Sequence, residues 1–284
     1  MITVLEAINL STDFLQKKGI QSPRINAELL LASVLKCKRL QLYLSFDRPL
    51  KQNELDSYRV LIKRRGYFEP LQYITGSVEF YNLEIKVNPA VLIPRPETEL
   101  LVETIIKSAN DKNQISILDI GCGSGAIGIS LAVILPDTEV FCTDISDGAI
   151  NLAEENAKQH NVYSKIKFLK HNIISQQIDF VSKLDIIVSN PPYVSKNDFD
   201  SLQNEIKNYE PRYALTDESD GYSFFKIISS KAEEKLTTGG KLFFEMAEGQ
   251  GSTVKNIMQE KSFSEIKIIK DYQNIDRVIY GVKK

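Results

Sequence analysis

The feature that most constrains the fold of this chain is an apolar run that two consecutive prolines bring to an end. Residues 184–188, Leu-Asp-Ile-Ile-Val, have the pattern of a buried strand. Pro191 and Pro192 follow shortly afterwards, and a central strand cannot continue through them because neither has an N–H for the ladder. The strand must therefore stop, with Asn190 and Tyr193 at its carboxyl end. In open α/β sheets this is the edge at which ligands bind.

The tetrapeptide Asn190-Pro191-Pro192-Tyr193 is also the signature of enzymes that methylate a nitrogen in a planar π system. The lone pair of such a nitrogen is delocalised, and complete loss of amide conjugation costs about 18–20 kcal/mol. The side-chain oxygen of Asn190 and the carbonyl of Pro191 can each accept one N–H of a target –NH2 group, with Pro192 beside them. Tyr193 offers a flat face for stacking. We therefore expect Asn190, Pro191 and Tyr193 to be catalytic; the alternative is an Asn-Pro turn that only ends a strand.

A glycine-rich loop lies upstream, between a predicted strand at 115–120 and a helix that begins at Ala126. Glycines permit a tight turn and a close approach of the backbone to a ligand. The G-x-G-x-G spacing is that of a methyltransferase, because Gly128 comes too late for a dinucleotide site. Together with the tetrapeptide, the loop predicts S-adenosyl-L-methionine as the ligand and S-adenosyl-L-homocysteine as the product. The residues expected to hold its methionine part are Gly121, Cys122, Gly123, Ser124 and Gly125.

Asp144 ends the next predicted strand, 139–144, about 20 residues after the loop. A carboxylate at this position can bind the hydroxyls of a ribose. The alternative role for Asp144 is to cap the helix that follows.

The composition is that of a soluble enzyme. The 284 residues, 43% of them hydrophobic, are enough for one large or two modest domains. No apolar run approaches the roughly 20 residues of a membrane span, and we expect no signal peptide. The three cysteines have no C-x-x-C spacing, and the net charge of −2 lacks the excess of a nucleic-acid-binding protein. We expect a cytoplasmic enzyme without metal, membrane or nucleic-acid partner. The basic cluster 63–65 is interpreted as a solvated helix face, and binding of a partner is the alternative.

The chain is predicted to divide into three parts. Residues 1–75 form a small helical bundle, in which Ser22 caps a helix that starts at Pro23 and a longer helix covers 51–68. Residues 76–94 form a β-hairpin linker with its turn at Asn82. Residues 95–284 form the catalytic domain.

Strands and helices alternate in the catalytic domain, which predicts an α/β, doubly wound, Rossmann-like sheet. The link at 271–274 is too short for a crossover helix, so the last two strands should be antiparallel neighbours. The expected fold is the seven-stranded, mostly parallel sheet of S-adenosylmethionine-dependent methyltransferases. The strands are expected near 115–120, 139–144, 165–170, 184–189, 241–246, 265–270 and 276–282.

Along essentially its whole length the chain resembles the release factor glutamine methyltransferases, the HemK/PrmC family. The segments that carry the resemblance are residues 94–99 (Pro-Arg-Pro-Glu-Thr-Glu), 119–127, 190–193, Glu210-Pro211, Ala214-Leu215, Asp220-Gly221, Gly239-Gly240, Glu245 and Gln250-Gly251. The box at 94–99 is the most family-specific of these segments. It is either a structural linker or a wall of the cofactor pocket, and the roles of Arg95 and Glu97 stay open.

The resemblance implies methyl transfer from S-adenosyl-L-methionine to the glutamine side chain in the Gly-Gly-Gln motif of peptide chain release factors. It also implies that Asn172 lies near the adenine. We expect Asn190 to contact both substrate and cofactor, and we expect the enzyme to be a monomer. Asn172 stands where the family usually has an acidic residue, and Ile173 where several members have an aromatic one. Ala247 replaces a common glycine. Residues 1–75 are expected to recognise the protein substrate; the alternative is a stabilising appendage.

Three other functions compete with this one. A ribosomal-protein glutamine methyltransferase would share the tetrapeptide and a helical N-terminal domain. A DNA adenine-N6 methyltransferase would share both motifs but must flip its base out of the duplex, and the acidic composition and the box at 94–99 argue against it. A silent S-adenosylmethionine-binding scaffold would be expected to have lost Asn190 or the proline pair.

Overall fold

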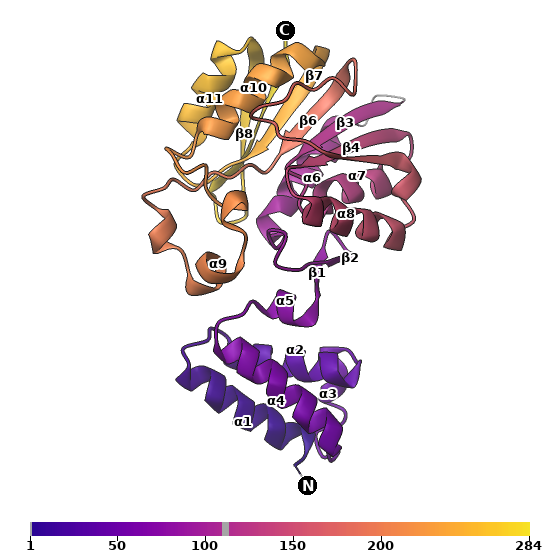
Figure 1. Ribbon diagram of the computed structural model, residues 1–284, viewed down its shortest axis with the longest axis vertical. Coiled ribbons are helices and arrows are strands. Elements are labelled where there is room, and N and C mark those ends of the chain that lie inside the picture. The colour runs from indigo at the N-terminus through magenta and orange to yellow at the C-terminus, as the bar shows by residue number, and fades with distance from the viewer. Residues whose placement is uncertain (1, 110–113) are drawn as a thin grey trace. The chain divides into compact units, whose positions relative to one another are not determined.

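The computed structural model describes residues 2–109 and 114–284 (Figure 1). The chain forms two compact units, Met1–Ser77 with Gln203–Tyr209, and Val78–Leu202 with Glu210–Lys284. The segment Gln203–Tyr209 therefore groups with the N-terminal helices, whereas the sequence placed it within the catalytic domain.

The first unit is helical and has its own apolar core. Helix α1 begins with a capping box, in which Thr3 accepts from Glu6 N–H and the Glu6 side chain accepts from Thr3 N–H. The helices of the first unit are α1 (Val4–Lys17), α2 (Pro23–Leu35), α3 (Arg39–Leu42), α4 (Gln52–Gly66), α5 (Leu71–Thr75) and α9 (Asn204–Tyr209). Helix α2 starts at Pro23 as predicted, but the prediction that Ser22 caps it is wrong. Ser22 has a φ of 49°, its side chain makes no capping hydrogen bond, and its carbonyl accepts from Asn26 Nδ2 instead.

Arg65 explains why α9 belongs to this unit. Its side chain is only 4% exposed; it donates to Asn26 Oδ1 at 2.7 Å and forms an ion pair with Glu205 of α9. Buried charges are stable only when paired and hydrogen-bonded. The interpretation of residues 63–65 as a solvated helix face is therefore wrong at Arg65, which ties two distant segments together.

The second unit contains a seven-stranded sheet in the order β5-β4-β3-β6-β7-β9-β8. All pairs from β5 to β7 are parallel, and β9 is antiparallel to both β7 and β8. The strands are β3 (Ile115–Ile120), β4 (Thr138–Asp144), β5 (Ile166–Lys170), β6 (Leu184–Ser189), β7 (Leu236–Glu245), β8 (Phe263–Lys270) and β9 (Asp276–Lys283). The predicted fold is confirmed. Only β7 begins well before its expected position, because Leu236 pairs with Leu184 ahead of a register shift.

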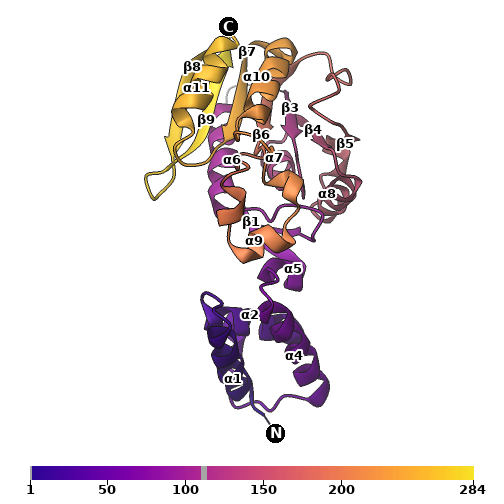
Figure 2. The same ribbon diagram turned by 60° about the vertical axis from the view of Figure 1, so that its left-hand side comes forward.

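Helices cover both faces of this sheet (Figures 1 and 2). The helices of one face are α6 (Pro96–Ala109), α7 (Ala126–Ile134) and α8 (Asp147–Gln159); those of the other are α10 (Ser223–Lys235) and α11 (Gly251–Glu260). Successive strand residues alternate between the two cores: Ile117 belongs to the first and Leu118 to the second. Short 3-10 turns lie at Tyr163–Lys165, Phe199–Ser201 and Arg212–Ala214.

The predicted hairpin is present as β1 (Ser77–Phe80) and β2 (Leu83–Lys86). Tyr81 and Asn82 have φ values of 49° and 60°, as a two-residue turn of type I′ requires. Asn156 of α8 pairs with both backbone groups of Lys86, which attaches β2 to the sheet domain. In the part of the chain that the structure describes, no helix is both long and apolar enough to span a membrane.

Candidate active site

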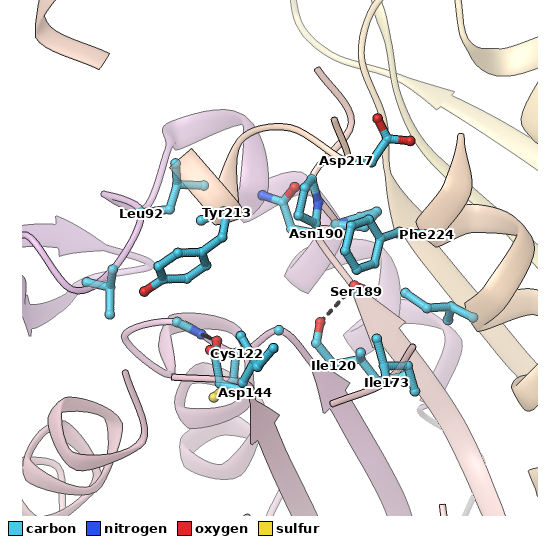
Figure 3. A pocket seen from close by; sticks show the side chains of 18 of the residues that line it. Leu92, Ile120, Cys122, Asp144, Ile173, Ser189, Asn190, Tyr213, Asp217 and Phe224 are labelled. Atoms are coloured by element: carbon cyan, nitrogen blue, oxygen red, sulfur yellow. Dashed lines mark hydrogen bonds between the residues drawn. The ribbon is translucent and has the colours of Figure 1, made fainter. Parts of the chain in front are cut away.

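The carboxyl ends of β3, β4, β5 and β6 open onto one cavity of about 600 Å³ (Figure 3). The strand order changes direction around β3, which lies between β4 and β6. Such a switch point is where ligands bind in open α/β sheets. The cavity is lined by Gly121–Ser124 after β3, Asp144 at the end of β4, His171–Ile174 after β5 and Asn190–Pro192 after β6.

The glycine loop presents its backbone to this cavity. Gly121 and Cys122 donate their N–H groups to the Thr143 carbonyl at 2.8 and 2.9 Å, which fixes the start of the loop to β4. Gly121 has a φ of +73° and a Cβ there would meet no atom within 4 Å. Glycine is therefore needed for the backbone conformation, and the space beyond the loop is open. Gly125 is not among the lining residues; a Cβ there would lie 2.9 Å from Ile129 Cδ1, inside the helix packing.

Asp144 is almost fully buried and is hydrogen-bonded to the glycine loop. Its Oδ2 accepts from Gly123 N–H at 3.0 Å and its Oδ1 from Ser146 N–H at 2.9 Å. Burial raises the pKa of Asp144, and the backbone hydrogen bonds counteract this effect. The cap of α8 is Ser146, whose hydroxyl accepts from Ala149 N–H. Asp144 is therefore not the helix cap, and an ionised carboxylate with two such bonds has acceptor capacity left.

Asn172 and Ile173 both line the cavity. Asn172 Oδ1 accepts from Ile174 N–H at 3.0 Å, and its own N–H donates to Gln176 Oε1 at 2.7 Å. The side-chain oxygen of Asn172 thus stabilises the turn in which Asn172 lies. Ile173 is buried and supplies an apolar wall near Ile120 (Figure 3).

Asn190 reaches the cavity from the end of β6. The preceding residue, Ser189, donates to the Ile120 carbonyl at 2.7 Å, which locks the end of β6 to β3 (Figure 3). The Asn190 Nδ2 group donates to Thr98 Oγ1 at 3.4 Å, and Pro191 and Pro192 line the cavity beside it.

Tyr193 is not among the lining residues. Its hydroxyl donates to Glu245 Oε1 at 3.3 Å, and its carbonyl accepts from Gln250 Nε2 at 3.1 Å. Burial raises the pKa of Tyr193, and the Glu245 carboxylate adds to the effect. The structure thus brings Asn190, Pro191 and Pro192 to the glycine loop and turns the Tyr193 side chain toward Glu245.

The box at 94–99 forms part of the cavity wall, through Pro94 and Thr98. Arg95 does not reach into the cavity but pairs with Glu210, which is almost fully buried and also accepts from Ile93 N–H at 3.3 Å. This ion pair attaches the box to the segment that follows α9.

Several lining residues were not predicted, among them Leu92, Tyr213, Asp217 and Phe224. The Tyr213 hydroxyl donates to the Ala90 carbonyl at 2.8 Å. Burial raises the pKa of Asp217, but hydrogen bonds from Ser223, Ser219 and Gly221 together bring it below its usual value. The segments Ala214-Leu215 and Asp220-Gly221 lie next to Tyr213 and Asp217 and match the family pattern, so they are the signal that could have indicated this region.

Comparisons with known proteins show the family of this chain. Residues 6–76 match the model described as the PrmC N-terminal domain, and residues 96–209 match the methyltransferase small domain. The release factor glutamine methyltransferase of Fusobacterium nucleatum is 41% identical over 98% of this chain and 78% of its own length. That of Clostridium botulinum is 39% identical over 95% of each chain. This chain belongs to the release factor glutamine methyltransferases.

The fold of this enzyme also resembles that of a solved methyltransferase. A methyltransferase from Pyrococcus furiosus superimposes with a TM-score of 0.53 at 19% identity, over 72% of this chain and 90% of that one. In the described ranges 2–109 and 114–284, no group of three or more His, Cys, Asp or Glu side chains could hold a metal ion.

Proposed function

We propose that this enzyme transfers the methyl group of S-adenosyl-L-methionine to the side-chain amide nitrogen of the glutamine in the Gly-Gly-Gln motif of peptide chain release factors. The observation that carries the proposal is that Asn190, Pro191 and Asp144 line the same cavity as the glycine loop. The residues that we propose to bind the –NH2 group and the ribose therefore line one open space.

The residues present fit the cofactor. A cavity of about 600 Å³ is within the usual range of about 300–1,000 Å³ for small-molecule sites. The glycine loop would hold the methionine part, Asp144 the ribose hydroxyls, and Asn172 with Ile173 the adenine. When bound, S-adenosyl-L-methionine supplies an electrophilic methyl group.

The role of Asn190 and Pro191 is to orient the nucleophile. Their oxygens would each accept one N–H of the glutamine amide, which directs the nitrogen lone pair toward the methyl donor. They would also stabilise positive charge that develops on the nitrogen during transfer. An amide nitrogen that gains a methyl group loses its proton readily, so no residue with a shifted pKa is required. Tyr193 would act from outside the cavity, by fixing the backbone after Pro192.

The names of the curated relatives favour release factors as substrates over ribosomal proteins. The helical unit would then recognise the protein substrate, because a Gly-Gly-Gln tip is too small to define one target. The net charge of −2 continues to argue against DNA.

One assay tests the proposal directly. Labelled S-adenosyl-L-methionine is supplied with a release factor, a ribosomal protein and DNA in parallel, and the modified residue is located by mass spectrometry. We expect one methyl group on the Gly-Gly-Gln glutamine. A mark on a lysine, an arginine or an adenine, or a clear preference for the ribosomal protein, would overturn it.

A further inference from the structure

The side-chain amide of Asn190 has an oxygen, which accepts hydrogen bonds, and an –NH2 group, which donates them. Only the oxygen suits a target –NH2 group. If the oxygen faces the cavity, it accepts an N–H of the substrate amide. If the group is turned by 180°, two –NH2 groups face each other and no hydrogen bond forms. The last torsion of an asparagine is broad and roughly two-fold, so some contact must select the correct end.

Thr98 contacts the –NH2 end of the Asn190 side-chain amide. The Thr98 side chain is buried in the first turn of α6, lines the cavity, and accepts from Asn190 Nδ2 at 3.4 Å. A hydroxyl alone cannot select the end of an amide, because it can donate to an oxygen as well as accept from an –NH2 group. The direction of the Thr98 proton therefore decides.

Glu245 is the acceptor that can fix the direction of the Thr98 hydroxyl proton. It ends β7 and is 2% exposed, and an ionised carboxylate can only accept. Its Oε1 accepts from the Tyr193 hydroxyl, whereas Oε2 is buried and has no hydrogen bond of standard geometry among the described residues. Oε2 therefore has capacity for a further donor, and the Thr98 hydroxyl also acts on Glu245 through a hydrogen bond. Burial raises the pKa of Glu245; hydrogen bonding by the Thr98 and Tyr193 hydroxyls, and the charge of Arg277, act to lower it.

We infer that Thr98 and Glu245 are positioning residues that fix which end of the Asn190 amide faces the cavity. The Thr98 proton is directed at Glu245, the Thr98 oxygen can then only accept, and the Asn190 –NH2 group must turn toward it. Asn190 Oδ1 is left to face the substrate. Thr98 acts through Asn190, and Glu245 acts through Thr98. The kinetic consequence rests on the proposed function, whereas the orientation of the amide does not.

The orientation is tested without substrate, by NMR of the ¹⁵N-labelled full chain. The Asn190 side-chain amide is identified as the signal pair missing from the Asn190→Asp spectrum. We expect one sharp pair in the wild type, a shifted or broadened pair in Thr98→Val, and recovery in Thr98→Ser. Thr104→Val is the matched control, because Thr104 lies on the same helix and its hydroxyl donates to the Leu100 carbonyl at 2.7 Å. An unchanged Asn190 pair in Thr98→Val overturns the inference.

The kinetic arm uses a release factor and separates turnover from cofactor affinity. Thr98→Val should lower kcat by about tenfold or more, a barrier change of about 1.4 kcal/mol, while the Kd for S-adenosyl-L-methionine changes less than about twofold. Thr98→Ser and Thr104→Val should stay near the wild type. Glu245→Gln should also lower kcat, because an amide cannot accept with both ends. Full turnover in Thr98→Val would overturn the role of both Thr98 and Glu245. If only Glu245→Gln keeps full turnover, the role of Glu245 alone is overturned. An inactive wild type would count against the proposed function and would leave the NMR arm to decide the inference.

Discussion

Gly123 and Asp144 are joined by a hydrogen bond of 3.0 Å, from the N–H of the glycine loop to Oδ2 at the end of β4. The other oxygen of the carboxylate is held by Ser146 N–H. Two segments that are separate in sequence are therefore oriented relative to each other by the protein itself. Preorganisation of this kind reduces the ordering cost of binding a ligand.

The first prediction concerns the charge of Asp144. Asp144→Asn keeps the shape and one acceptor oxygen but removes the charge, so the affinity for S-adenosyl-L-methionine should fall by about tenfold or more, since hydrogen bonds to charged groups contribute about 1.5–3 kcal/mol. Isothermal titration calorimetry measures this. The control is Asp147→Asn, which removes an exposed carboxylate of α8 that pairs with Lys170. Equal affinities in the two variants would rule out a role of Asp144 in cofactor binding.

The second prediction concerns Asn190. Asn190→Ala should reduce kcat by about 10²-fold or more, by analogy with loss of one oxyanion-hole donor, and should change the Kd for the cofactor far less. Asn190→Asp should retain part of the activity, because a carboxylate still accepts an N–H bond. Single-turnover kinetics with a saturating release factor separate the methyl-transfer step from binding. Near-normal turnover by the alanine variant would remove Asn190 from the mechanism.

The third prediction concerns Asp119, a fully buried residue of β3. Its Oδ2 accepts from Gly128 N–H at 3.1 Å, while Oδ1 has no hydrogen-bond partner among the described residues. Burial raises the pKa of Asp119 to about 7, against about 3.9 in an unfolded chain. Between these values the native state holds a proton that the unfolded state has lost. The free energy of unfolding therefore falls as the pH rises from about 4 to about 7, by a few kcal/mol, and the Asp119 contribution is constant above that range.

The asparagine of Asp119→Asn cannot ionise, so this variant should lack the decrease in the free energy of unfolding that Asp119 causes. Urea denaturation of both proteins at pH 5 and pH 8 measures the difference. The raised pKa values of Asp144 and Glu245 act in the same direction, but they are present in both proteins and cancel in the comparison. Equal pH dependence of the two proteins would show that Asp119 does not titrate in this way.

The sequence predicted the parts of the fold that depend on local patterns. Parallel strands buried on both faces appear as continuous apolar runs, and the hairpin turn at Asn82 follows from the residues that tolerate a positive φ. The same reasoning placed the glycine loop, Asp144 and Asn190 at one edge of the sheet, because the carboxyl ends of parallel strands meet there.

The contacts that were missed join residues far apart in the chain. Tyr193 was expected to face the ligand, but its neighbour Glu245 is supplied by β7, and only the sheet order brings the two together. Likewise, Arg65 gains its partner Glu205 from α9. No periodicity or motif within either segment indicates such a pairing.

The last prediction concerns the length and polarity of the target side chain. If Asn190 and the Pro191 carbonyl both accept hydrogen bonds, the target must present two N–H groups on one planar nitrogen. A release factor with Gly-Gly-Glu offers only acceptors when ionised, which leaves buried groups unpaired at about 1–3 kcal/mol each, so it should not be methylated. A Gly-Gly-Asn version keeps the amide but is one methylene shorter, and a displacement of about 1 Å can cost on the order of 10²-fold in rate. Comparison of the initial rates of labelled methyl transfer to the three release factors checks this order. If the asparagine version reacts as fast as the glutamine version, the cavity does not position the amide through two fixed acceptors.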